Sequence, residues 1–396
     1  MYHTSDIQAA VQTGLGEAVA LSEALFDYAE LPYHEYRSSQ AMVEVLKKAG
    51  FQVEYPFLEE ELGYGSAFRA TLENGPGPKV AFLAEYDALP GIGHGCGHNL
   101  HGSLSVLAGL SMARLRSAFS GTVCVIGTPA EEENGAKIAM ARKGVFDDFS
   151  LAVMMHSWSG GRSQPDMDVL SLRCYVVEFY GTEAHAVAAP WRGNSALAAA
   201  RKVLDLVDAR RECFTHDIFF NAVLLEGGAA PNILPGYAKI RLEFRTDARG
   251  KLEEMDRIVR NCANGAALAM DCRVTFTPGL EDFDDMVRVH ALEEEVARLL
   301  RENGEAVAPI QPASGSSDVG NVSYRCPTIQ PLLSIVDAPY ALHTEQLRDA
   351  TKLPRAHVAL ERGACVLTEL ALRVLTDTGF REAVEADYQA AKALKG

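Results

Sequence analysis

The sequence has few cysteines, and they show no regular spacing. Eight cysteines stand at positions 96, 124, 174, 213, 262, 272, 326 and 365 of 396 residues. A disulfide framework usually pairs closely spaced cysteines in a short secreted chain. This scatter therefore argues against such a framework and favours a reducing compartment.

Long apolar runs are also missing. No stretch approaches the roughly 18–20 continuous apolar residues that span a bilayer. The first residues, MYHTSDIQAA, do not place a basic segment before an apolar one, which is the pattern of a signal peptide. We therefore expect a soluble, cytoplasmic protein.

Positive charge is in deficit, with 37 Lys and Arg against 53 Asp and Glu and a net charge of −16. Nucleic acids and anionic membranes would repel such a chain, so we expect neither as a partner. Apolar residues make up 48% of the sequence, enough for a large core. The length predicts two domains, or one large domain with an insertion.

Short apolar runs alternate with helical patterns in the first part of the chain. The runs are Lys79–Ala84, Gly121–Thr128 and Leu151–Met155, and helical patterns cover Leu100–Arg116 and Ala136–Lys143 between them. Buried strands that alternate with helices predict an α/β fold with a mostly parallel sheet and helices on both faces. Residues 7–29 and 38–49 are expected to form amphipathic helices before the first strand.

The pattern changes near residue 172, where strand-like segments become longer and are no longer separated one by one by helices. The expected strands are 172–180, 219–226, 237–245 and 272–277, with helices at 194–211 and 250–270. We predict a catalytic domain of residues 1–172 and 281–396, interrupted by a smaller α+β lid or dimerisation domain of residues 173–280. Beyond it, Asp282–Asn303 should be helical and Gln330–Ile335 should form one more strand.

Polar side chains follow each of the three apolar runs of the first domain. Glu85–Asp87 follows the first run, Glu131 and Glu132 follow the second, and His156 follows the third. In open α/β sheets, ligands bind at the carboxyl ends of the strands. Three such groups in succession predict one site.

The segment Glu85–Gly102, EYDALPGIGHGCGHNLHG, combines histidines, a cysteine and acids on a glycine-rich turn. Cys96 and His98 offer a thiolate and an imidazole, which suit a divalent transition metal. Two alternatives remain. The glycines could form a phosphate-binding loop, although the run is not G-x-G-x-x-G, and Cys96 alone is more often a small buried apolar residue.

The acidic run after the second strand allows two interpretations. Such a run is usually a solvated face. However, one carboxylate can bind a metal while its uncoordinated neighbour acts as a general base, and this would suit Glu132 and Glu131. Similarly, His156 could be a core histidine and His343 a surface one. The order of these residues along the chain favours a common site.

At this point the sequence resembles the M20 metallopeptidases, particularly the amidohydrolase branch with aminoacylase-like and aminobenzoyl-glutamate hydrolase-like enzymes. The resemblance is carried by AEYDALPGIGHGCGHN (84–99), GTPAEE (127–132), MMHS (154–157), GTEAHAVAAPWRGNSAL (181–197), GGAAPNILP (227–235), SSDVGNVSYRCPTIQP (316–331) and HTEQL (343–347). Two features depart from the branch. Asn99 stands where many members have aspartate, and AELPYHEY (29–36) lacks the usual preceding histidine and proline.

The resemblance implies two divalent metal ions per subunit, with zinc or manganese favoured and cobalt or nickel as alternatives. It also implies a water that the two metals activate. The implied ligands are Cys96, which would bridge the ions, and His98, Glu132, His156 and His343. Glu131 would be the general base and acid. Asp87 would orient a ligand.

In the lid, the resemblance implies that His185 stabilises the oxyanion in the active site of a neighbouring subunit, within at least a homodimer. Asn232 and Arg245 would hold carboxylate or carbonyl groups of the substrate, although the pattern alone favours an external salt bridge for Arg245. The expected substrate is an N-acyl amino acid or a dipeptide. A cysteine hydrolase with Cys96 as nucleophile and a binding protein without turnover are the alternative functions.

Overall fold

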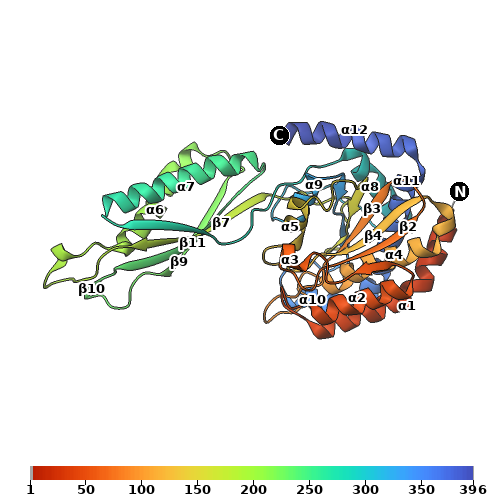
Figure 1. The fold of residues 1–396 in the computed structure, drawn as a ribbon, viewed down its shortest axis with the longest axis horizontal. Coiled ribbons are helices and arrows are strands. Elements are labelled where there is room, and N and C mark those ends of the chain that lie inside the picture. The colour runs from red at the N-terminus through yellow and green to blue at the C-terminus, as the bar shows by residue number, and fades with distance from the viewer. Residues whose placement is uncertain (1–2, 396) are drawn as a thin grey trace. The chain divides into compact units, whose positions relative to one another are not determined.

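The computed structural model describes residues 3–395, with residues 61 and 62 described in their backbone only (Figure 1). The chain divides into two compact units. The main unit contains the chain up to Asp168, then Met286–Ala313 and Asp318–Leu394, and the inserted unit contains Val169–Asp285, Ser314–Ser317 and Lys395. The predicted domain boundaries were 172/173 and 280/281. The short segment Ser314–Ser317 was not assigned to the insertion from the sequence.

A six-stranded sheet forms the centre of the main unit, in the order β1-β2-β4-β3-β5-β13. Its strands are β1 (Gln52–Glu54), β2 (Phe68–Asn74), β3 (Lys79–Ala84), β4 (Gly121–Gly127), β5 (Leu151–Val153) and β13 (Thr328–Ile329). The strands from β4 to β13 pair in parallel, whereas β1 pairs with β2, and β2 with β4, in antiparallel fashion. The predicted mostly parallel sheet is therefore confirmed, and the antiparallel edge is an addition.

The predicted strand at Gln330–Ile335 lies outside this sheet. Leu332–Ser334 forms β14, which pairs in parallel with β6 (His156–Trp158) as a separate two-stranded ribbon. This ribbon continues directly from β5 and β13, so it extends the chain beyond the carboxyl edge of the sheet. His156 is the first residue of β6.

Helices of the main unit cover the sheet and bury its apolar side chains. They are α1 (Thr4–Tyr28), α2 (Tyr36–Lys48), α3 (Glu59–Leu62), α4 (His98–Arg114), α5 (Ala136–Arg142), α8 (His290–Glu302), α9 (Val319–Ser323), α10 (Glu345–Ala350), α11 (Pro354–Thr376) and α12 (Thr378–Lys395), with a 3-10 turn at Arg116–Ala118. Helix α8 begins at His290, later than the predicted Asp282, because Phe283 is in extended pairing with Leu172. None of the helices within residues 3–395 has the length and apolarity needed to cross a bilayer.

Helix α4 is central because it is buried on all sides. Every residue from His98 to Met112 is buried, and the helix packs between the sheet and helices α1 and α11. Gly102 allows this close packing, since a Cβ there would lie 2.0 Å from the backbone oxygen of Glu85. The start of α4 is thereby held against the end of β3, where the predicted site residues lie.

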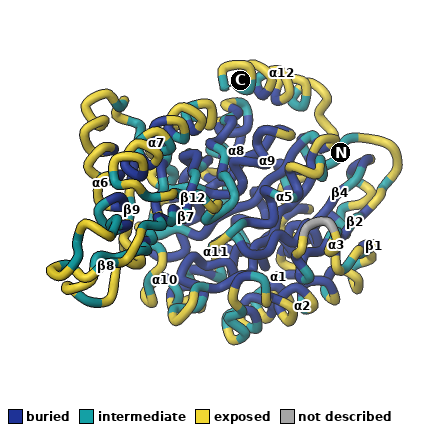
Figure 2. Tube along the Cα trace, turned by 60° about the vertical axis from the view of Figure 1, so that its left-hand side comes forward, coloured by how far each residue is buried: buried dark blue, intermediate teal, exposed yellow. Residues whose placement is uncertain are grey.

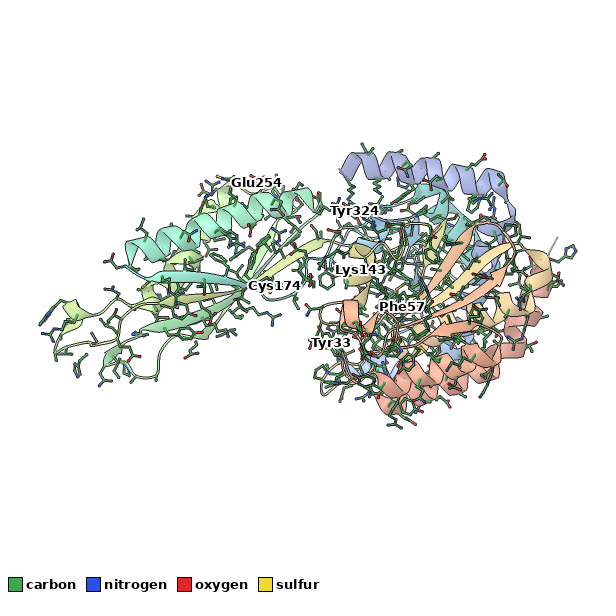
Figure 3. All side chains as sticks on the ribbon, viewed as in Figure 1. Tyr33, Phe57, Lys143, Cys174, Glu254 and Tyr324 are labelled. Carbon is green, nitrogen blue, oxygen red and sulfur yellow. The ribbon has the colours of Figure 1, made fainter. Side chains whose placement is uncertain are left out.

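The inserted unit is an antiparallel sheet in the order β12-β7-β11-β9 with two helices packed on it (Figures 1 and 3). Its elements are β7 (Ser171–Tyr180), β8 (Ala184–His185), α6 (Ala196–Arg210), β9 (Phe219–Glu226), β10 (Ile233–Leu234), β11 (Tyr237–Thr246), α7 (Gly250–Ala269) and β12 (Arg273–Pro278), with 3-10 turns at Pro190–Arg192 and Arg211–Cys213. Cys174 on β7 is buried, whereas Glu254 on α7 is exposed (Figure 3). This arrangement agrees with the α+β pattern expected from the sequence.

Candidate metal centre

The turn between β3 and α4 places Cys96 and His98 at the carboxyl edge of the sheet. It ends at Gly97, which has φ +76° and precedes the first residue of α4. A Cβ at Gly97 would lie 2.6 Å from the Ser157 side chain, so only glycine fits. Cys96 and His98 are both buried as a result.

His98 is held so that one ring nitrogen is left without a partner. Its Nδ1 lies 2.9 Å from the Asp87 backbone oxygen and 3.0 Å from Asp87 Oδ1, so it donates its proton there. The opposite nitrogen, Nε2, is buried and forms no hydrogen bond with any residue that the structure describes. A buried, unpaired imidazole nitrogen costs free energy unless it binds something, and a metal ion is the usual partner for a histidine oriented by a carboxylate.

The turn after β4 brings Glu131 and Glu132 to the same place. Ala130 has φ +61°, and its N–H donates to the buried Glu35 carboxylate at 2.9 Å. The N–H of Glu132 donates to Asp87 Oδ2 at 3.0 Å. These two bonds fix the turn, and Asp87 thereby holds both His98 and Glu132.

Distances around His98 Nε2 define a compact group. A Glu132 oxygen lies 3.8 Å away and a Glu131 oxygen lies 4.0 Å away. The ligand atoms of Cys96, His98 and Glu132 all lie within 4.8 Å of one another. At these distances His98 Nε2 forms no hydrogen bond with either carboxylate, and the spacing suits atoms that surround a cation.

His156 and His343 approach the group from other elements. The Nδ1 of His156 donates to the Ser157 backbone oxygen at 2.8 Å, which leaves Nε2 as an acceptor. His343 has φ +62°, its N–H donates to the Gly95 oxygen at 3.1 Å, and its Nε2 lies 3.5 Å from Glu132 Oε2. His343 is the only one of the five predicted ligands with an exposed side chain, at 55%.

The electrostatics of the group also favour the binding of a cation. Burial and the carboxylates of Glu132 and Glu131 raise the pKa of the Cys96 thiol well above its usual value. Burial, Glu85 and Glu132 raise the pKa of Glu131 in the same way. Divalent cations would reverse both effects, because they stabilise the thiolate and the carboxylates. The residues present therefore fit bound divalent metal ions.

Four further buried residues belong to this region and were not predicted from the sequence. They are Glu85, His101, Lys137 and Asp318. Glu85, His98, His101 and His156 place ligand atoms within 4.8 Å of one another, and so do Glu85, Glu131 and Asp318. Glu85 and His101 stand in the glycine-rich segment already identified, which was the available signal. Asp318 stands in segment 316–331, which carried the family resemblance but suggested no role for it, and Lys137 gave no signal.

In the inserted unit, the structure brings His185 and Asn232 together. Strands β8 and β10 pair, and the N–H of Ala186 donates to the Asn232 backbone oxygen at 2.8 Å. The His185 Nδ1 accepts from the N–H groups of Val187 and Ala188, so its Nε2 carries the proton. Both His185 and Asn232 are exposed, as is most of this ribbon (Figure 2).

Arg245 lies elsewhere in the same unit. It stands near the Thr246 end of β11. The ribbon of β8 and β10, which carries His185, lies beyond the opposite end, at Tyr237. At ~3.3 Å per residue, the two ends of this segment are about 26 Å apart. The guanidinium is half-buried and contacts Glu243 and the Ser316 hydroxyl at 3.1 to 3.3 Å. A small substrate cannot contact Arg245 and His185 of one inserted unit at once.

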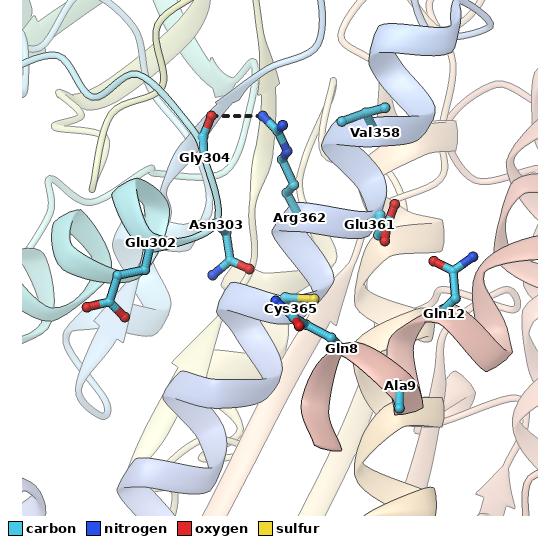
Figure 4. A pocket seen from close by; sticks show the side chains of 10 residues that line it. All are labelled: Gln8, Ala9, Gln12, Glu302, Asn303, Gly304, Val358, Glu361, Arg362 and Cys365. Atoms are coloured by element: carbon cyan, nitrogen blue, oxygen red, sulfur yellow. Dashed lines mark hydrogen bonds between the residues drawn. The ribbon is translucent and has the colours of Figure 1, made fainter. Parts of the chain in front are cut away.

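A cavity of about 700 Å³ in the main unit contains none of the predicted site residues (Figure 4). Residues of α1, α8 and α11 line it, with Asn303 and Gly304 after α8. Its cation, Arg362, already donates to the Gly304 oxygen at 2.9 Å and to Glu305. The cavity therefore offers no arrangement comparable with the group around His98.

Comparison with known protein families gives a match over most of the chain. Residues 81–364 match the model of peptidase family M20/M25/M40. The chain belongs to this family. The matched region runs from β3 to α11 and so includes all the predicted metal ligands.

Relatives of this M20-family chain include the mouse (Mus musculus) Xaa-Arg dipeptidase, 31% identical over 394 residues that cover 93% of this chain and 88% of that protein. One of the chains of the p-aminobenzoyl-glutamate hydrolase of Escherichia coli is 24% identical over a match that covers 93% of this chain and 91% of that protein. A dinuclear metal-binding M20 peptidase from Bacillus subtilis has the same fold, with a TM-score of 0.68 at 19% identity, covering 92% of this chain and 99% of that one.

These findings confirm the predicted family, the α/β fold and the assignment as an M20-type hydrolytic enzyme. The roles of the individual site residues stay predictions.

Proposed function

We propose that this enzyme hydrolyses the amide bond of N-acyl amino acids or dipeptides with the help of two divalent metal ions. The observation that carries the proposal is the unpaired Nε2 of His98, with Cys96 and Glu132 grouped around it and the Glu131 carboxylate 4.0 Å away. The names of the relatives support it, since one is a dipeptidase, one an aminobenzoyl-glutamate hydrolase, and a structural neighbour binds two metals.

Cys96, His98, Glu132, His156 and His343 would hold the ions. When bound, the two ions would lower the pKa of a water molecule and polarise the amide carbonyl of the substrate. Glu131, which holds no ligand position in this scheme, takes the proton from the water and returns it to the departing amine. Asp87 keeps the His98 ring in place.

We also propose that two copies of the chain complete each active site. His185 donates from its Nε2 to the developing oxyanion, and Arg245 binds the substrate carboxylate. Arg245 is near one end of β11, and the ribbon that carries His185 lies beyond the other end. The two side chains can therefore serve one substrate only if they come from different subunits.

The edge strand β9 supports this assembly. Its Phe219, Val223, Leu224 and Leu225 are exposed, between 47% and 56%. An exposed apolar edge strand favours association with another chain. The free cysteines throughout residues 3–395 suit a reducing cytoplasm, where we propose that the dimer works.

The test is a panel of N-acyl amino acids and dipeptides, including dipeptides that end in arginine, assayed with Mn²⁺, Zn²⁺ or Co²⁺. We expect hydrolysis that a chelator abolishes and metal restores. Glu131→Gln should retain bound metal but lose turnover by about 10²–10⁴-fold. Glu133→Gln, at the last carboxylate of the run 131–133, is the matched control and should stay active.

Two results would contradict the proposal. Wild-type turnover in Glu131→Gln would exclude Glu131 as the base. Activity that resists chelation but is lost on alkylation of Cys96 would indicate a cysteine hydrolase instead.

A further inference from the structure

Glu85 is fully buried at the end of β3 and shares its carboxylate between two partners. Oε1 accepts from Lys137 Nζ at 2.7 Å, and Oε2 accepts from His101 Nε2 at 2.9 Å. Oε2 also lies 3.5 Å from the unpaired His98 Nε2. A carboxylate at this distance could itself bind a metal held by His98. The contacts of Glu85 with Lys137 and His101 therefore decide whether this carboxylate can reach such a metal.

Lys137 supplies the restraint. This side chain is completely buried, and its ammonium group donates to Glu85 and to Asp318 Oδ1, each at 2.7 Å. Asp318 is fixed in turn, because its Oδ2 accepts the Lys137 backbone N–H at 3.3 Å. Gly135 leaves room for it, since a Cβ there would lie 2.4 Å from Asp318. The cation is thus anchored on the Oε1 oxygen of Glu85, the one that does not approach His98.

His101 links Glu85 to a predicted ligand. The Ser157 N–H donates to His101 Nδ1 at 3.2 Å, so the proton of the neutral ring is on Nε2, where it donates to Glu85. Both nitrogens of His101 are therefore occupied within the protein. The ring centroids of His101 and His156 are 4.7 Å apart, and His156 Nδ1 donates to the carbonyl oxygen of Ser157. Fixing the backbone of Ser157 fixes the orientation of the His156 ring.

We propose that Lys137, Glu85 and His101 form a positioning chain that orients His156 and keeps Glu85 out of metal coordination. The proposal rests on the proposed metal site. The rival arrangement is that Glu85 and His101 are themselves ligands, together with His98 and His156, because all four are buried and close together. The two arrangements differ in what happens when Glu85 loses its charge. A positioning residue changes the affinity, whereas a ligand changes the coordination.

The experiment is a Co²⁺ titration of the metal-free Glu85→Gln protein, followed by visible absorption and by bound cobalt per chain. We expect two Co²⁺ ions per chain and the wild-type absorption spectrum, with affinity about 10–100-fold weaker. Glu305→Gln is the matched control. Glu305 is also buried and ion-paired, but its partners are Arg355 and Arg362, which are not among the proposed site residues. It should bind Co²⁺ like the wild type.

Loss of one Co²⁺ ion or an altered spectrum in Glu85→Gln would show that Glu85 is a ligand, and unchanged affinity would show that it positions nothing. Either result overturns the proposal. If Glu85→Gln does not fold, His101→Gln decides in the same way, since it should also keep two ions. If the wild type binds no Co²⁺, the proposed function fails as well. If the wild type binds Co²⁺ and hydrolyses the substrates, only the positioning chain is in question.

Discussion

In the main unit, the predicted metal ligands other than His343 are buried or nearly so, whereas in the inserted unit His185 and Asn232 are exposed. Asp87, for example, accepts a hydrogen bond from the His98 ring with its backbone oxygen and its carboxylate. The same carboxylate accepts the backbone N–H of Glu132. His185, in contrast, is bonded through its ring only to the turn that follows it. One region holds its polar side chains in fixed positions, and the other presents them to solvent.

Among the tests that compare the two units, the largest expected effect shows whether the exposed His185 takes part in the reaction. His185→Ala should lower kcat by about 10²–10³-fold with little change in KM, because a donor to the oxyanion works only in the transition state. Steady-state kinetics on the best substrate of the panel measure this. His216→Ala, another exposed histidine of the inserted unit, is the matched control and should behave like the wild type.

Mixing the two inactive variants sharpens this test. His185→Ala and Glu131→Gln chains are unfolded and refolded together in equal amounts. Half of the dimers then contain one chain of each kind, and one of the two sites in such a dimer has both Glu131 and His185. About a quarter of the wild-type activity should therefore return. Absence of any recovery, with mixed dimers demonstrated, would place His185 in the active site of its own chain or nowhere near the reaction.

A second effect separates Arg245 from the ribbon that carries His185. Arg245→Ala should raise KM by about 10–100-fold for substrates with a free carboxylate, since a hydrogen bond to a charged group contributes about 1.5–3 kcal/mol. Substrates with an amidated carboxyl group should show little change. Arg241→Ala, on the same face of β11, is the control. Equal losses for acid and amide substrates would mean that Arg245 has only a structural role.

Metal removal should make the contrast between the units measurable as a difference in stability, because only the main unit should respond. At metal concentrations about 100 times Kd, binding contributes about 2.7 kcal/mol per ion, which corresponds to a Tm difference of roughly 5–10 °C for each ion bound. The two tryptophans allow this to be measured separately. Trp158 is in the main unit and Trp191 in the inserted unit.

Trp191→Phe leaves Trp158 as the reporter, and its unfolding transition should move to lower temperature with chelator. Trp158→Phe leaves the exposed Trp191, whose transition should not move if the two units unfold separately. A shift of the Trp191 transition alone would mean that the metal had been assigned to the wrong unit.

Most of the proposed ligands could be singled out from the sequence because they follow a recognisable strand or turn, and the family resemblance supplied their roles. Cys96 and His98 share one glycine-rich segment, and Glu132 closely follows a buried strand. These are local signals. The mostly parallel sheet then brings the strand ends together, as the α/β pattern requires.

Other parts could not be predicted because their contacts are not local. Lys137 and Asp318 are 181 residues apart in the sequence, and a lone lysine on a short helix normally lies in solvent. Likewise, β2 joins the sheet in antiparallel fashion, and the start of α8 is delayed by the pairing of Phe283 with Leu172. In each case a tertiary partner decides the outcome, and the partner is invisible to local patterns.

The smallest expected effect concerns the free energy of unfolding of the main unit, which depends on a buried carboxyl group away from the proposed metal site. Asp166 is completely buried, its Oδ1 accepts from the N–H groups of Met167 and Gln330, and Oδ2 has no partner. Burial raises the pKa of this carboxyl group from 3.8 to about 7. The folded protein therefore keeps a proton that the unfolded chain releases between these values.

Stability from this group is greatest below pH 3.8 and is lost as the pH rises towards about 7, by at most about 1.4 kcal/mol per pH unit. Asp166→Asn removes this dependence and retains the acceptor for both N–H groups. Its Tm relative to the wild type should thus be higher at pH 8 than at pH 5. Asp148→Asn, at an exposed carboxylate of the same unit, is the matched control. If Asp166→Asn instead loses Tm relative to the wild type as the pH rises, Asp166 is ionised in the folded protein, and the buried carboxylate must have a cationic partner.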